Sequence, residues 1–496
     1  MRETRYLGTL ATAIAVIFVL AGCSHAVFPQ TGGSSGSTSP VILTLHDAPP
    51  SGPSGVTVTS FEVTITGAVL QPGNVSLLST PQTVELTQLQ TNSILLPTTQ
   101  VAQGTYTSLT ITYASPQYTF LNDSGVSVTV NGQACPANAS CVVSNPTATN
   151  LTGTATFSPT VAVGDNQTLI EADVNLNDII QSDFSLNFSQ SAGATVTQST
   201  NSSGTVTTLG TMEIAGQVSS VTASSTQFQL LASTGQTFTI TAGSGTDFEF
   251  ARANCTANDF TCITAGEIVD VAVNIQSDGV TLDAGEVDYD DASGTQQVSG
   301  TIVAQAGTPP TSVLVVVHNT IPPVSSLPPG TGVVVNIGSG TSYVINSGSF
   351  MLPSGLSFAS TSDVIVGQEV EARVASNSSI ANDAFTTDRL ALEQTQLEAI
   401  VSAVDSQVQP YPYFILSPLP ALFSSAPVDS VFQLEVVDTS ANQSAGTVYQ
   451  DLTPANIGGL VNGQYVTTGG FLFNTTGSVG SPSIIATIVR GEVPGT

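Results

Sequence analysis

Gly266-Glu267-Ile268-Val269 decides how the C-terminal half of the chain is read, because it returns twice. The later copies are Gly367-Gln368-Glu369-Val370 and Gly463-Gln464-Tyr465-Val466. A second motif precedes each copy, as Gly245-Thr246-Asp247-Phe248, Gly340-Thr341-Ser342-Tyr343 and Gly446-Thr447-Val448-Tyr449. Two motifs in the same order, three times, indicate three structural repeats.

Each repeat has the pattern of a small β-barrel. An opening strand, such as Ile214–Val218, leads into a hairpin such as Phe228–Leu230 with Phe238–Ile240. The Gly-Thr-x-aromatic motif then turns the chain and places an aromatic side chain in the core. The Gly-Glu/Gln motif, a turn that needs positive φ at its glycine, starts a further strand such as Ile268–Val273. Five or six short strands predict a barrel of the OB type.

These repeats resemble an uncharacterised bacterial family that occurs in tandem in exported proteins. The third copy departs most, because prolines interrupt it. Its strand order therefore stays open. The prolines are Pro410, Pro412, Pro418 and Pro420.

The region from Val41 to Phe188 predicts a β-sandwich, because short apolar strands alternate there with turns rich in Gly, Pro and Asn. Together with the repeats it gives an all-β chain, an N-terminal β-sandwich followed by three tandem OB-like barrels. Val, Ile and Thr are abundant throughout, and they favour pleated strands over helices.

This N-terminal region resembles bacterial lipoprotein domains of unknown function that open with a Leu-Thr-Asp-Ala-Pro-like motif. The matching residues are Leu45-His46-Asp47-Ala48-Pro49, Val84-Glu85-Leu86 and Gly104-Thr105-Tyr106, with His46 in the place of Thr. The resemblance implies a transthyretin-like sandwich and no known activity. Asp47 is read as the cap of a turn before Pro49, with a ligand role as the alternative.

The N-terminus has the pattern of an export signal. Arg2 and Arg5 precede an uncharged apolar run from Leu7 to Leu20, which is too short for an ordinary spanning helix. Leu20-Ala21-Gly22-Cys23 resembles the lipobox of bacterial lipoproteins, which implies that Cys23 is acylated and becomes the first mature residue. The alternative is an ordinary secretory signal with a chance cysteine. With Ser24 after the cysteine instead of Asp, the resemblance implies an outer-membrane location.

These features divide the chain into seven segments. They are 1–22 (lipoprotein signal peptide), 23–40 (flexible tether), 41–188 (β-sandwich), 189–211 (linker), 212–293, 296–393 and 396–492 (barrel repeats).

The charge balance excludes some partners. The chain has no Lys and no Trp, and cleavage before Cys23 leaves 4 basic and 34 acidic side chains, a formal charge of −30. Nucleic acids and anionic membrane surfaces are bound through clustered Lys and Arg, so neither is a predicted partner. Attachment to a membrane is expected only through the lipid on Cys23.

The remaining four cysteines form two close pairs. Cys135 with Cys141 and Cys255 with Cys262 predict two local disulfides in an oxidising compartment. A zinc site would need further Cys or His at the usual spacing. A redox role is the other alternative, although the C-x-x-C spacing is absent.

The sequence predicts no catalytic residue and no cofactor. The chain has only three His and contains no H-E-x-x-H, P-loop or dinucleotide motif. One acidic cluster offers oxygen ligands of the kind that Ca²⁺ prefers, but its spacing does not match the EF-hand loop. We interpret it as a solvated acidic edge that protects a strand from pairing, with metal binding as the weaker alternative. The cluster is Asp283, Glu286, Asp288, Asp290 and Asp291.

Three function classes follow. The favoured one is a non-enzymatic cell-envelope lipoprotein, a surface binding or spacer protein whose partner is an envelope protein or polysaccharide. The second is a hydrolase acting on envelope or extracellular polymers, for which the sequence offers no nucleophile–base pair. The third is an accessory subunit of an envelope assembly.

Overall fold

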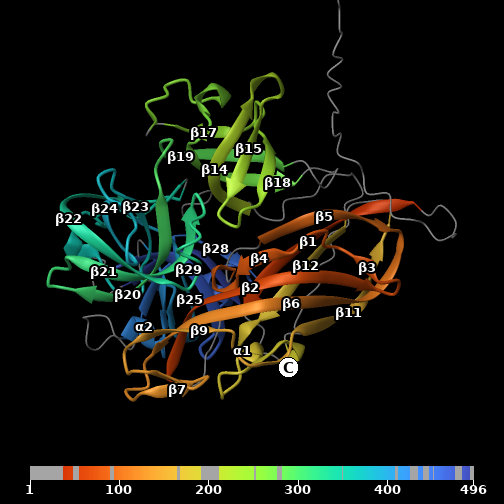
Figure 1. The fold of residues 1–496 in the computed structure, drawn as a ribbon, viewed down its shortest axis with the longest axis horizontal. Helices are drawn as coiled ribbons and strands as arrows, with labels where there is room; N and C mark the ends of the chain where they lie inside the picture. The colour runs from red at the N-terminus through yellow and green to blue at the C-terminus, as the bar shows by residue number, and fades with distance from the viewer. Residues whose placement is uncertain are drawn as a thin grey trace, which may run out of the picture. The chain divides into compact units, whose positions relative to one another are not determined.

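Strands dominate the chain, as the Val, Ile and Thr content predicts (Figure 1). The computed structural model describes residues 37–48, 55–89, 94–164, 168–190, 212–250, 253–275, 282–348, 350–407, 411–424, 434–439, 446–450, 452–474 and 483–491. Cys23, the signal segment and most of the predicted tether and linker lie outside these ranges. Among the described residues, no helix has the length and apolar character needed to cross a membrane. The predicted all-β class is confirmed.

Two sheets form the N-terminal sandwich. One has the order β12-β1-β5, and the other has the order β11-β6-β2-β3, with β4 also on β2 and β9 also on β6. The strands are β1 Thr38–Ala48, β2 Val56–Gln71, β3 Val75–Ser76, β4 Gln82–Glu85, β5 Ile94–Ala102, β6 Gly104–Asn122, β9 Ser140–Ser144, β11 Thr152–Val163 and β12 Thr168–Asn175. Smaller elements are η1 Leu86–Gln88, β7 Val128–Val130, β8 Gln133–Cys135, β10 Ala148–Asn150, α1 Leu176–Ile179, β13 Leu186–Asn187 and η2 Phe188–Gln190.

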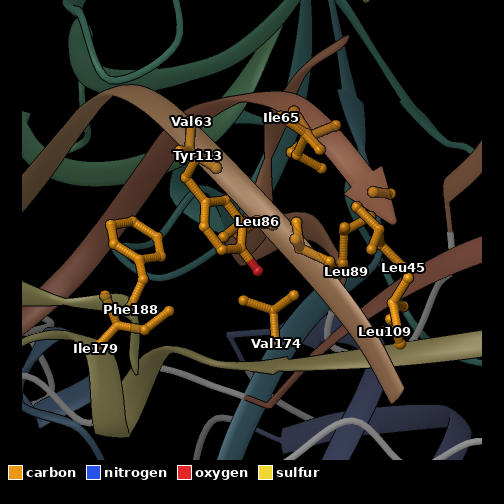
Figure 2. Packing of buried hydrophobic residues seen from close by; sticks show 14 of the residues in the cluster. Leu45, Val63, Ile65, Leu86, Leu89, Leu109, Tyr113, Val174, Ile179 and Phe188 are labelled. Atoms are coloured by element: carbon orange, nitrogen blue, oxygen red, sulfur yellow. The ribbon is translucent and has the colours of Figure 1, made fainter. Parts of the chain in front are cut away.

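The sandwich core lies between the two sheets. Leu45 of β1 faces it from one sheet, and Val63 and Ile65 of β2 face it from the other (Figure 2). Tyr113 and Phe188 stack at its edge with ring centroids 4.4 Å apart. Tyr106 closes a corner by donating a hydrogen bond to the carbonyl of Ala102 at 2.7 Å.

The opening strand of the sandwich, β1, reaches Ala48. β1 continues through His46 and Asp47, whose backbones pair with Asp173 and Val174 of β12. The backbone of Asp47 therefore belongs to a strand. Its side chain and residues 49–54 lie outside the described residues, so the turn-cap interpretation stays a prediction. The strand ends before Pro49, which cannot donate a ladder hydrogen bond.

The remaining strands form three sheets in chain order (Figure 1). The first barrel has β14 Met212–Thr222, β15 Gln227–Ala232, β16 Thr237–Thr241, β17 Asp247–Glu249, β18 Ile268–Ile275 and β19 Leu282–Asp291. The second has β20 Gln297–Ala306, β21 Ser312–Ile321, β22 Gly332–Ile345, β23 Glu369–Val374 and β24 Ala384–Leu392. The third has β25 Thr395–Asp405, β26 Tyr413–Leu416, α2 Ala421–Ser424, β27 Leu434–Val437, β28 Val448–Gln450, β29 Tyr465–Phe473 and β30 Ser483–Gly491.

All three barrels share one strand order. The opening strand pairs antiparallel with the second strand and with the strand that follows the Gly turn, as β14 does with β15 and β18. The third strand closes the ring by pairing parallel with the last, as β16 does with β19, β22 with β24 and β27 with β30. This is the five-stranded OB arrangement. The prolines of the third copy leave the order unchanged.

The Gly-Glu/Gln motif has the same geometry in each barrel. Its glycine has φ of +93°, +91° and +88° at Gly266, Gly367 and Gly463, as predicted. The amide of each glycine donates to the opening strand, to Val218, Ile302 and Val401. The next side chain accepts from the amide three residues earlier, from Thr264 to Glu267, Ile365 to Gln368 and Val461 to Gln464.

In the Gly-Thr-x-aromatic motif the threonine carries the shared contact. Thr246, Thr341 and Thr447 each donate a hydroxyl hydrogen bond to the last strand, to the carbonyls of Ala284, Thr387 and Ala486, at 2.7, 2.9 and 2.7 Å. The aromatic residue is buried at Phe248 and Tyr449. In the second barrel the motif lies inside the continuous strand β22, so the predicted turn at Gly340 is wrong there.

Candidate functional site: two buried polar junctions

The acidic cluster predicted from the sequence lies on β19, the last strand of the first barrel. Its final residues, Asp290 and Asp291, are 4% and 3% exposed. Asp283, Glu286 and Asp288, earlier on the strand, are half-buried. The interpretation of the whole cluster as a solvated edge is therefore wrong, because its two terminal carboxylates are removed from water.

Two arginines of the second barrel hold these carboxylates and define the first junction. Arg389 Nη2 lies 2.6 Å from Asp290 Oδ1, and Arg373 Nη1 lies 2.8 Å from Asp291 Oδ1. The guanidinium of Arg389 also contacts Glu371, and Gln297 donates to both aspartates. This network of ion pairs and hydrogen bonds joins β19 to β20, β23 and β24.

Burial changes the protonation of the neighbouring glutamates. Removal from water raises the pKa of Glu371 well above its ordinary value. The charge of Asp290 raises this pKa further, and the charge of Arg389 lowers it by less. The pKa of Glu393 is raised in the same way, first by burial and then by Asp270 and Asp290. Protonation of these groups brings the charge of the junction closer to balance.

Three carboxylates of the first junction, Asp290, Asp291 and Glu371, offer oxygens within 4.8 Å of one another. Such a set can hold a divalent cation. Here, however, Arg389 Nη2 contacts all three, at 2.6 Å to Asp290 and 3.3 Å to Asp291. A guanidinium therefore occupies the position that a cation would need. Glu249, Glu286 and Asp288 form a second, more exposed acidic group.

The second junction joins the sandwich to the second barrel at His318 of β21. This imidazole is 3% exposed. Its Nδ1 lies 2.9 Å from Glu369 Oε1 in its own barrel, and its Nε2 lies 2.8 Å from the backbone carbonyl oxygen of Thr59 in the sandwich. The side-chain amide of Gln88 in η1 also approaches Nδ1, at 2.6 Å.

Nδ1 faces the Glu369 carboxylate and Nε2 faces the Thr59 carbonyl, and an imidazolium donates to both of these acceptors. The amide nitrogen of Gln88 beside Nδ1 is a donor and not a further acceptor. Burial lowers the pKa of His318. The charge and hydrogen bond of Glu369, supported by Glu85 and the Thr59 carbonyl, outweigh burial and raise that pKa to about 9. The ring is charged at neutral pH.

Two β-bulges make this contact possible. The register of β2 against β6 shifts between Val58 and Ser60, and Thr59 is the extra residue. The register of β20 against β21 shifts between Ser299 and Gly300, and His318 is the extra residue on β21. A bulged residue leaves the regular ladder, so its groups can turn to another partner. Two bulges thus meet at the junction.

Polar and apolar contacts surround His318. Thr119 of β6, which is fully buried, donates to the carbonyl of Gly330 at 2.7 Å, and Leu121 packs in the core cluster of the second barrel. Gln396 of the third barrel donates to the carbonyl of Gln88 at 3.0 Å. The second barrel therefore covers β6 from Gln117 to Leu121.

Thr301, His318 and Glu369 are the residue types of a hydrolytic triad, and the fold brings them together. The hydroxyl of Thr301 lies 3.5 Å from His318 Nε2 and donates to Glu369 at 2.8 Å. A general base needs a free lone pair on the nitrogen that faces the nucleophile. Because that nitrogen donates to Thr59, the arrangement does not suit nucleophilic catalysis.

A pair of carboxylates lies beside this junction. Glu62 of β2 is directly opposite Glu85 of β4. Burial, followed by the charge of Glu85, raises the pKa of Glu62 to about 7. Glu85 accepts hydrogen bonds from the Phe61 amide, the Ser60 hydroxyl and Thr87, so its oxygens are committed to structure.

Both predicted disulfides are present. Cys135–Cys141 follows the β7–β8 hairpin of the sandwich, and Cys255–Cys262 lies before the Gly266 turn of the first barrel. Their partners match the sequence prediction.

The residues that sequence reasoning missed are His318, Glu369 and the arginines. His318 follows the apolar run from Val313 to Val317, and a titratable residue in the middle of a buried strand was the available signal.

Comparisons with known proteins add little. No family model matches the chain, and no curated protein matches it. A solved structure titled "drosophila Unr CSD456" is similar over 58% of this chain and 99% of its own length, at 10% identity and a TM-score of 0.12.

Proposed function

We propose that this protein is a non-enzymatic lipoprotein of the cell envelope, anchored through Cys23, whose sandwich and barrels form one binding scaffold. One observation carries the proposal. The ionisable groups best suited to chemistry, His318, Glu369 and Arg389, are buried in contacts that fasten one module to the next.

Each barrel contacts the sandwich, which favours a binding scaffold and not a spacer of barrels in series. Ile42 of β1 packs in the core cluster of the first barrel, and Leu121 of β6 packs in that of the second. In the third barrel, Arg490 lies 3.9 Å from Glu171 of β12. All three barrels thus contact the sandwich, so their number does not set a simple length.

The charge of the surface limits the partner. Arg373 and Arg389 are engaged in the first junction, and Arg490 is engaged with Glu171. The accessible charges of the described barrels and sandwich are therefore mostly carboxylates. Their complement is a neutral or cationic envelope protein or polysaccharide, because like charges across an interface cost free energy.

Fractionation of the native host tests the anchor. The protein without substitutions should sediment with membranes. Cys23→Ser should release it, because the acyl chains carry the attachment. Ser24→Ala is the matched control and should stay bound. Full retention of Cys23→Ser in the membrane pellet would contradict the proposal.

The non-enzymatic part is tested against the hydrolase alternative. Ester and glycoside substrates of the envelope should show no turnover that depends on Thr301 or Glu62. Turnover that Thr301→Val or Glu62→Gln abolishes, in protein that keeps its melting temperature, would establish the hydrolase instead.

A further inference from the structure

The second junction contains a group whose charge is set by pH, and this property goes beyond the proposed scaffold. His318 provides the charged contact between β21 and the bulge at Thr59. The other cross-junction contacts around it, Thr119 to Gly330 and Gln117 to Pro329, join neutral groups.

We propose that His318 is a proton-controlled clamp, which holds the second barrel on the sandwich while its imidazole is charged and releases that contact when the proton is lost. The Glu369 carboxylate and the Thr59 carbonyl both receive a hydrogen bond from the ring only when each ring nitrogen carries a proton. A neutral imidazole has one donor, so either Glu369 or the Thr59 carbonyl would face a lone pair. A buried acceptor without its donor costs free energy, which separation of the surfaces relieves by admitting water.

The other ionisable groups around the ring are carboxyls. Glu369 faces it from β23, Glu85 from the end of β4, and Glu62 lies behind Glu85 on β2. The pKa values of both His318 and Glu62 are raised, to about 9 and about 7. Each group therefore favours the closed junction in acid. For His318 the contribution is complete below pH 6.5 and is lost as pH rises through 9.

The size of the effect follows from one proton. If the closed junction retains a proton that the open one has lost, the equilibrium between them changes by up to about tenfold per pH unit. The clamp is thus closed in mild acid and at neutrality, and it opens progressively in alkali.

The accessibility of a buried thiol reports this opening. Thr119→Cys, in a Cys23→Ser background, places one free thiol beneath the second barrel, because the other four cysteines are paired. Thr156→Cys on β11 is exposed and corrects for thiol ionisation. The ratio of maleimide labelling rates, Thr119→Cys to Thr156→Cys, should rise several-fold per pH unit between pH 7 and 9.

His318→Gln and Glu62→Gln separate the clamp from general charge repulsion in an acidic protein. With His318→Gln most of the rise in the labelling ratio should be lost, leaving only the part that Glu62 contributes, whereas Glu62→Gln should keep most of the rise. A flat ratio in the parent background, or the same rise with His318→Gln, would overturn the proposal.

A direct measurement needs no change at His318. Histidine-selective NMR of the full chain should show one imidazole that is charged at pH 7.5 and titrates near pH 9. His25→Gln and His46→Gln assign the other two signals. If the His318 signal titrates at or below about pH 6.5, the clamp does not exist.

Discussion

Both junctions bury polar groups, but they use different cations. Arg389 joins the first barrel to the second, and a guanidinium cannot lose its proton in a protein. His318 joins the second barrel to the sandwich, and an imidazole can. The same chemistry of paired charges therefore gives one joint whose cation is permanent and one whose cation depends on pH.

The backbone is irregular at both junctions. Arg389 extends from β24 to Asp290 and Asp291 on a neighbouring barrel, where Asp290 is the extra residue of a bulge on β19 and Asp388 the extra residue on β24. His318 lies in a bulge on its own strand and meets another at Thr59. Both contacts are thus built on bulges, and they differ in the chemistry of the cation.

Removal of the permanent cation should have the largest effect. Arg389→Met leaves Asp290, Asp291 and Glu371 buried beside one another, so we expect a loss of about 3–5 kcal/mol of unfolding free energy. Urea denaturation at pH 7 measures it. Arg490→Met, whose partner Glu171 is 3.9 Å away, is the matched control and should cost less than about 1 kcal/mol. Equal losses would mean that the first junction contributes no more than a surface pair.

A change in the turn beside the first junction should have the next largest effect. Gly266→Val forces a β-branched residue into φ of +93° and brings its Cβ to 2.3 Å from Ser293 Oγ, on the connection to the second barrel. Gly463→Val meets the same backbone strain in open space, at φ of +88°. We expect about 1–3 kcal/mol for Gly463→Val and more for Gly266→Val.

Amide exchange locates that loss. In Gly266→Val, faster exchange should be confined to strands β14 to β19, since the first barrel has its own core cluster apart from Ile42. If exchange increases equally across all barrels, the modules unfold together and the first junction is not a boundary.

The protonation of Glu371 gives a smaller, pH-dependent test of the first junction. Because its pKa is raised, the stability that its proton provides is present in acid and is lost as pH rises. Glu371→Gln copies the protonated form. Its stability should differ from that of the parent protein by less than about 1 kcal/mol at pH 6, and at pH 9 the variant should be more stable than the parent. Thermal melts at both pH values decide this. A stability difference between variant and parent that is the same at pH 6 and pH 9 would show that Glu371 is ionised throughout this range.

Calcium should have the smallest effect. Since Arg389 contacts all three buried carboxylates, millimolar Ca²⁺ should raise the melting temperature by less than about 5 °C. A larger rise that Asp290→Asn abolishes would mean that the ion displaces the guanidinium.

Sequence reasoning was most successful where the contacts are local. The positive φ at Gly266, Gly367 and Gly463 could be predicted because a three-residue turn dictates it. The disulfides could be predicted because each pair closes a short loop. The acidic cluster could not, because Asp290 is buried by a residue 99 positions away, and nothing near it in the chain signals the guanidinium of Arg389.

The strand-rich fold class, the threefold repeat, the pairing of the cysteines and the acidic charge balance could all be predicted from the chain alone, since these depend on residue type, periodicity and short spacings. The tertiary structure alone decided which charges are solvated and which are buried. Thr59 and His318 are 259 residues apart, and they meet only because two separately folded sheets present bulges to one another. Whether a carboxylate or an imidazole keeps its ordinary pKa depends on what the folded chain places around it, and that information is not contained in any local stretch.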